Sequence, residues 1–111
     1  MLPKIPNRQT AVLQRAVYSA NEIGERVPVW HTFATLGGVL DMSSGGTNYS
    51  TFNAKFMEST HVFLTNYNAT ITGATNCRAL ICGAVYDVTM IDNPCGLNDH
   101  LEIYLTFKGV A

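Results

Sequence analysis

Residues 14–45 read QRAVYSANEIGERVPVWHTFATLGGVLDMSSG, and this stretch decides the fold that we predict. A first strand over residues 10–18 ends within it, and a polar turn follows. Residues 27–42 then form a long second strand, because they are rich in β-branched and aromatic side chains. Glycine inside a strand marks a bulge or a sharp bend, so Gly37 and Gly38 predict that this strand bends and serves two faces of a small barrel.

The rest of the chain adds short strands separated by turn-forming residues. These strands are predicted over residues 60–67, 78–82, 84–91 and 101–108. The pattern predicts one all-β domain over residues 1–111, mainly β with one short helix, built as a small antiparallel β-barrel or sandwich. Residues 1–9 contain two prolines and are expected to form an extended arm. The core candidates are large apolar and aromatic side chains on the strands: Leu13, Trp30, Phe63, Tyr86, Leu101, Ile103, Leu105 and Phe107.

An insertion after the second strand, residues 41–58, is predicted to be a long loop followed by a short helix. Its first half is rich in serine and glycine, which is typical of a loop. Tyr49, Phe52 and Phe56 follow at spacings of three and four, which place the three rings on one side of a helix. These rings either cap the barrel core or pack against a neighbouring subunit.

The composition favours an assembly subunit, with a compact monomer as the alternative. Only 14% of the 111 residues are charged and 47% are apolar, so part of the surface is expected to be covered by other molecules. The net charge is −1 without any cluster of Lys and Arg, which argues against nucleic-acid binding as the main function. A near-neutral wall nevertheless suits a channel through which DNA passes. No secretory signal or membrane-spanning stretch is expected, and the three cysteines are expected to be free thiols.

Metal, catalytic and base-stacking sites were considered and are not predicted. The possible zinc ligands, Cys77, Cys82, Cys95 and His100, lack the close pairing of zinc knuckles, so small buried thiols are favoured. No nucleophile elbow, phosphate loop or paired carboxylates accompany the histidines His31, His61 and His100. The strand aromatics Trp30, Tyr67, Tyr86 and Tyr104 have few interleaved cations, so a core position is favoured over base stacking.

The order of sequence motifs resembles that of the head–tail joining, or head-closure (stopper), proteins of tailed bacteriophages. The matching segments are VLQR at residues 12–15, GERVPVW at 24–30, FATL at 33–36 leading to MSSG at 42–45, STHVF at 59–63 and GAVYDV at 83–88. The resemblance extends over nearly the whole chain.

This resemblance implies a structural virion protein without enzymatic activity or cofactor. Such proteins form a ring, commonly of about twelve copies, in the virion neck between the portal or its adaptor and the tail, after assembly in the bacterial host cytoplasm. The ring lines and helps to close the DNA exit channel, contacts the passing phage DNA without reading its sequence, and offers a docking surface to a tail terminator or tail-completion protein. Carried over to this chain, the channel-loop candidates are Asp41, Met42, Ser43, Ser44, Gly45, Gly46, Thr47, Asn48, Tyr49, Phe52 and Phe56.

Two further expectations concern contacts with other components. The arm at residues 1–9 and the last strand at residues 101–108 are predicted to clasp neighbouring proteins, because exposed strand edges favour pairing with another chain. Two alternative functions remain: a tail-completion or tail-terminator ring subunit, and a single-strand nucleic-acid-binding β-barrel.

Overall fold

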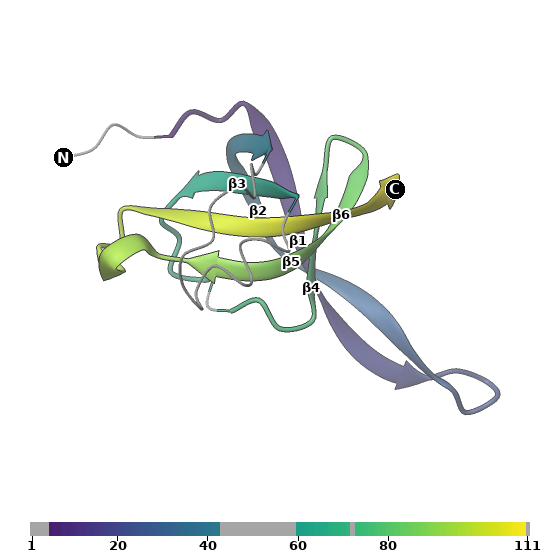
Figure 1. The fold of residues 1–111 in the computed structure, drawn as a ribbon. Helices are drawn as coiled ribbons and strands as arrows, with labels where there is room; N and C mark the ends of the chain where they lie inside the picture. The colour runs from purple at the N-terminus through teal and green to yellow at the C-terminus, as the bar shows by residue number, and fades with distance from the viewer. Residues whose placement is uncertain (1–4, 43–59, 72, 111) are drawn as a thin grey trace.

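Six antiparallel strands make up the fold in a computed structural model, which describes residues 5–42, 60–71 and 73–110 (Figure 1). In chain order they are β1 (Gln9–Ala20), β2 (Arg26–Met42), β3 (His61–Asn66), β4 (Cys77–Ile81), β5 (Ala84–Asp92) and β6 (His100–Val110). A single 3-10 turn, η1 (Pro94–Gly96), connects β5 to β6.

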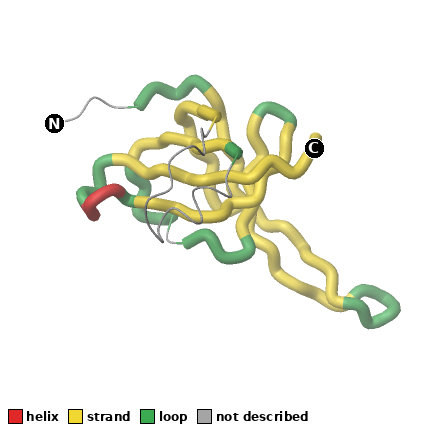
Figure 2. The backbone as a smooth tube through the Cα atoms, viewed as in Figure 1, coloured by secondary structure: helices red, strands yellow, loops and turns green. Residues whose placement is uncertain are grey.

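The strands close into a ring in the order β1-β2-β3-β6-β5-β4, with β4 pairing back onto β1. The prediction of an all-β antiparallel fold is therefore confirmed, and of the two architectures left open the closed one is observed. The barrel is not regular, because β1 and β2 run on as a two-stranded hairpin well outside the ring (Figures 1 and 2). No α-helix occurs in the part of the chain that the structure describes, and the predicted short helix lies outside those residues.

Six of the eight core candidates lie inside this ring: Leu13, Phe63, Tyr86, Leu101, Ile103 and Leu105 are all buried. The other two do not. Trp30 is only half-buried because it lies on the outer part of β2, where β2 pairs with β1 alone. Phe107 is 46% exposed because β6 pairs with β3 only as far as Leu105, so its last residues extend beyond the covered core.

Gly38 lies where β2 changes its hydrogen-bonding partners. It is paired with Gln9 of β1 and also begins the pairing with β3, opposite Thr65. A Cβ atom at Gly38 would lie 2.1 Å from the carbonyl oxygen of Leu64 and 2.9 Å from the Phe63 ring. Three strands therefore meet around a backbone that has no room for a side chain. The glycine pair accordingly lies where β2 passes from one part of the barrel to the next.

Candidate functional site

The insertion between β2 and β3 leaves the barrel and returns to it at one place. Asp41 and Met42, the first two channel-loop candidates, are the exposed last residues of β2. Met42 pairs with His61, the first residue of β3, so the two roots of the insertion are neighbours in the sheet. The other nine candidates, from Ser43 to Phe56, lie outside the described residues.

Thr60 fastens the second root of the insertion to β6. Its backbone N–H donates to the carbonyl oxygen of Leu105 at 2.8 Å, and its hydroxyl oxygen accepts a hydrogen bond from the N–H of Phe107, also at 2.8 Å. These bonds extend the β3–β6 ladder by one position beyond His61. The return of the insertion is therefore held on two strands, β2 and β6.

Aromatic rings support the same root from the side of β5 and β6. The His61 and Tyr86 rings meet edge to face at 5.1 Å between centroids, and Tyr86 meets Phe107 in the same manner at 5.7 Å. Burial raises the pKa of the Tyr86 phenol, and nearby Cys82 adds to the effect, so the ring stays neutral. The half-exposed Phe107 is thus part of an aromatic cluster (His61, Tyr86 and Phe107) at the barrel end where the insertion begins.

The described part of the N-terminal arm lies on its own barrel. The side-chain amide of Asn66 makes two hydrogen bonds with the backbone of Ile5. Its Oδ1 accepts from the N–H of Ile5 at 3.0 Å, and its Nδ2 donates to the carbonyl oxygen of Ile5 at 3.1 Å. The N–H of Arg8 donates to the carbonyl oxygen of Gly38. Clasping of neighbouring proteins by residues 1–9 stays a prediction. In the structure, the backbone of Ile5 and of Arg8 is hydrogen-bonded to the barrel of the same chain.

Comparison with known families decides the class of protein. The sequence pattern of the family described as phage head completion protein matches residues 6–106. The chain belongs to the phage head completion protein family. No curated protein matches the chain. Membership in this family identifies the protein as a structural component of a phage virion. The family is non-enzymatic, and its members associate with other head–tail proteins.

The thiols of this head completion protein are unpaired but not all buried. Cys77 lies in the core, as expected for a small buried thiol, whereas Cys82 and Cys95 are exposed. Cys82 and Cys95 lie in turns and have positive φ angles of 50° and 54°. The sequence pattern did not indicate that these two thiols are exposed. Within the described residues, no three acidic, histidine or cysteine side chains are grouped as metal ligands would be.

The four strand aromatics considered for base stacking do not form a common platform. Tyr86 and Tyr104 are buried, and Arg78 covers the Trp30 ring with its guanidinium carbon 4.1 Å from the ring centroid.

Within the described ranges, no helix has the length and apolar character needed to cross a bilayer.

The sequence analysis missed a polar cluster on β5 and β6. His100, Glu102 and Tyr104 share one face of β6 by alternation, and the strand register adds Asp92 of β5 to them. Glu102 accepts hydrogen bonds from the Tyr104 hydroxyl at 2.6 Å and, at 3.2 Å, from the His100 imidazole when that nitrogen carries a proton. Asp92 stands directly opposite Glu102 on the neighbouring strand. Burial and then the Glu102 carboxylate raise the pKa of Asp92, while His100 lowers it.

We expect Asp92→Asn to stabilise the barrel at neutral pH. Because the pKa of Asp92 is raised in the folded state, folding favours the protonated carboxyl, and its ionisation costs stability as the pH rises through that pKa. Removing a like-charge pair across strands should raise the free energy of unfolding by up to about 1 kcal/mol. Urea unfolding at pH 7, repeated below the pKa of a free aspartate, about 3.9, measures this gain, which should vanish in acid.

Asp87→Asn is the matched control for that substitution. Asp87 lies on the same strand but forms an ion pair with Lys108 at 3.2 Å, so its neutralisation should bring no gain. A lower stability of Asp92→Asn than of the unmodified protein at pH 7 would contradict the repulsion between Asp92 and Glu102.

Proposed function

We propose that this head completion protein is a head-closure subunit. Copies of it form a ring, of about twelve subunits, between the portal or its adaptor and the tail. The insertion after β2 lines the DNA exit channel and helps to close it, and the outer surface of the ring offers a docking site to a tail terminator or tail-completion protein. Phage DNA passes through the channel without sequence-specific contacts.

The observation that carries this proposal is the geometry of the insertion roots. A segment whose two ends are paired residues, Met42 and His61, can change its conformation without moving the barrel that bears it. The closed ring of six strands supplies the rigid body, and the sequence of the insertion contains Gly45 and Gly46; glycine is the residue type with the widest choice of backbone conformations. A circle of such segments around an axis is suited to narrow or widen a channel.

The low charge of the chain agrees with a passage for DNA. With 7 basic and 8 acidic side chains, the protein lacks the surplus of cations that would hold a phosphate backbone in place. Among the described cations, Arg78 is stacked on Trp30 and Lys108 is paired with Asp87. Strong binding would retain the DNA, whereas a neutral wall lets it slide.

Assembly of the purified chain with purified portal and adaptor rings tests the proposal. We expect the chain to join portal–adaptor complexes as a ring, which size-exclusion chromatography with light scattering would detect. Binding to tail tubes in place of portal complexes would replace head closure by a tail-terminator function. Tight and salt-sensitive binding of single-stranded oligonucleotides by the isolated chain would favour a nucleic-acid-binding barrel.

A further inference from the structure

The outer part of the β1–β2 hairpin is a two-stranded ribbon that pairs with no third strand among the described residues and contacts the barrel at its base, where Arg78 stacks on Trp30. Of β1, only residues 11–15 pair with β4, and β2 pairs with β3 only from Gly38 onward. Residues 16–20 and 26–30 therefore form strand pairs only with each other, while the N–H of Ala16 at the base also donates to the carbonyl oxygen of Asn76. We call these residues, together with the turn between them, the ribbon. Two-stranded ribbons are marginally stable in water, so this one needs a surface to pack on.

One face of the ribbon is an exposed aliphatic ridge. Val17 and Val29 stand opposite each other in the register and are 54% and 42% exposed. Val27 follows on the same face, since side chains alternate along a strand. Ile23, in the turn, is 80% exposed.

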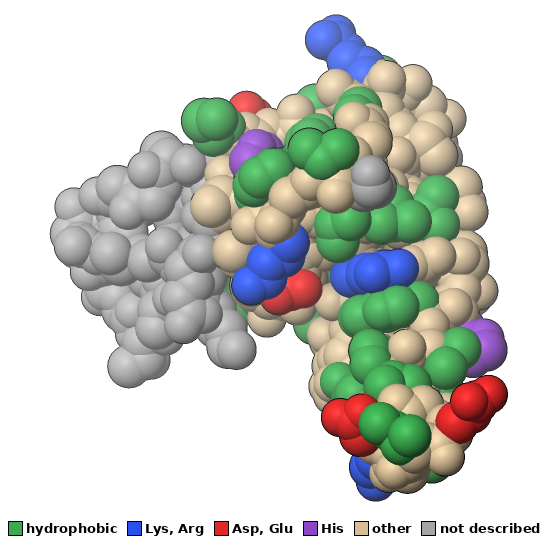
Figure 3. Space-filling view, turned by 90° about the vertical axis from the view of Figure 1, so that its right-hand side faces the viewer, with side chains coloured by type: hydrophobic (Ala, Val, Ile, Leu, Met, Phe, Trp, Pro, Cys, Tyr) green, Lys and Arg blue, Asp and Glu red, His purple; other side chains and the backbone are tan. Residues whose placement is uncertain are grey.

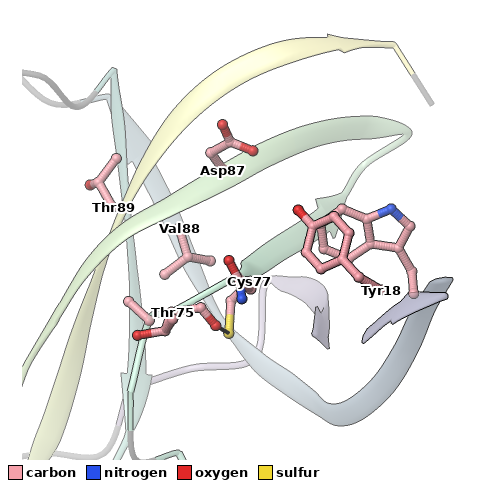
Figure 4. Close-up of a pocket in the computed structure, with 9 residues that line it drawn as sticks. Tyr18, Thr75, Cys77, Asp87, Val88 and Thr89 are labelled. Atoms are coloured by element: carbon pink, nitrogen blue, oxygen red, sulfur yellow. Dashed lines mark hydrogen bonds between the residues drawn. The ribbon is translucent and has the colours of Figure 1, made fainter. Parts of the chain in front are cut away.

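The opposite face of the ribbon borders a cleft. Tyr18 and Trp30 form one wall, and Thr75, Cys77 and Val88 belong to the facing side (Figure 4). The cleft has a volume of about 610 Å³. A water molecule takes up about 30 Å³ in the liquid, so the cleft is many times larger than one water and can admit side chains of another molecule. The molecule thus carries a ridge and a recess on the two faces of one ribbon.

The charges near the ridge and the recess are complementary. The turn of the ribbon carries two exposed carboxylates, Glu22 and Glu25, and one cation, Arg26. Figure 3 shows acidic side chains at this end of the hairpin. At the recess, Arg78 lies over Trp30, and Lys108 is paired with Asp87 at the rim. The two cations thus border the cleft through their contacts with Trp30 and Asp87, and Asp87 is the one charged residue among those that line it. Counting these neighbours, the edge of the cleft carries two cations and one anion, the reverse of the turn.

We propose that the ribbon of one subunit docks in the cleft of a second copy of this chain, with the Val17–Val29 ridge in the recess and the acidic turn toward Arg78 and Lys108. Ridge and recess are different surfaces, so the contact is heterologous and can repeat from subunit to subunit until a ring closes. The second face of each docked ribbon is a wall of its own subunit's cleft, which receives the ridge of the next subunit, so the ribbons would stand side by side around the ring. This inference rests on the proposed function and specifies which surfaces join the subunits.

The first test places charges on the ridge. We expect Val17→Asp combined with Val29→Asp to leave the barrel folded, because both side chains are exposed and lie outside the ring. The matched control is Leu97→Asp combined with Val110→Asp, which adds the same charges at sites that are 70% and 87% exposed. Circular dichroism and urea unfolding establish that each variant is folded. Ring formation on purified portal–adaptor complexes is then measured, and we expect at least a tenfold loss for the ridge variant alone.

The second test examines the contact itself by cross-linking. In a background with Cys77→Ala, Cys82→Ser and Cys95→Ser, which removes the native thiol of the cleft as well as the two exposed ones, one protein carries Val29→Cys and another carries Thr75→Cys. After assembly on portal complexes, a short bifunctional maleimide should link the two proteins to each other, giving dimers in the mixture but not with Val29→Cys alone. Normal rings from the ridge variant, or rings without this cross-link, would overturn the ribbon contact while head closure stands. If the unmodified protein forms no ring on portal complexes, the proposed function fails instead.

Discussion

Gly38→Val is expected to prevent the barrel from closing. The added Cβ would lie 2.1 Å from the Leu64 carbonyl oxygen, where no flexible side chain can move away, and the Phe63 ring is already fully buried. The strands β2 and β3 would have to separate at the position where their pairing begins. Forcing extra atoms into a packed core typically costs about 1–3 kcal/mol and more where backbone must move, which is a large part of the total stability of a small domain, about 5–15 kcal/mol.

Soluble yield, circular dichroism and urea unfolding would measure that loss. The matched control is Gly73→Ala, since a Cβ atom there would meet nothing within 4 Å and the backbone has no left-handed conformation. The control should unfold at the same urea concentration as the unmodified protein. A Gly38→Val protein of normal stability would show that β2 and β3 do not approach each other as closely as the structure indicates.

Deletion of residues 44–48 is expected to leave the barrel folded while filled heads lose most of their DNA. The segment belongs to the insertion, whose roots are held by the Met42–His61 pair and by the bonds of Thr60 to β6. Shortening a loop between fixed ends changes its closure free energy by well under about 1 kcal/mol. The stability should therefore stay nearly the same, and only the channel-closing function should be lost.

DNA retained by heads completed with the deletion variant is the quantity to measure, together with infectivity. A second variant, in which the same positions carry a Gly-Ser sequence of equal length, separates the effect of loop length from that of the side chains. Heads that keep their DNA and infectivity with the deletion would remove the gating role from this loop. They would not affect membership in the head completion family, which rests on residues 6–106.

The local pattern of the sequence was enough to place most of the fold. The final strand illustrates this, because Leu101, Ile103 and Leu105 alternate with polar residues and all three are buried. The long second strand was predicted over residues 27–42 and is observed as Arg26–Met42. The final strand succeeds because one of its faces packs on the core, although Tyr104 of the other face is buried too. The second strand succeeds because β-branched and aromatic residues favour a strand even where few of them are buried. The all-β class follows from the same periodicity.

The pattern of apolar residues predicts burial less well where one strand extends beyond the end of its neighbour in the sheet. Phe107 and Trp30 were predicted to lie in the core as large aromatic side chains on strands. Each lies on a strand segment that pairs with one neighbouring strand fewer than the rest of that strand, and neither is fully buried. In β1 the buried positions change from Ala11 and Leu13 to Ala16, because the register with β2 shifts between Leu13 and Gln14. Such bulges and strand ends depend on long-range pairing, which no local segment encodes.

The sequence by itself therefore determined the strands, their order along the chain and the family to which the protein belongs. Only the tertiary structure decided that the sheet closes, that the ribbon extends beyond it, and that a ridge and a cleft lie on its two faces. The physical reason is that side-chain alternation is set within a few residues, whereas closure and overlap are set by which distant backbones share hydrogen bonds.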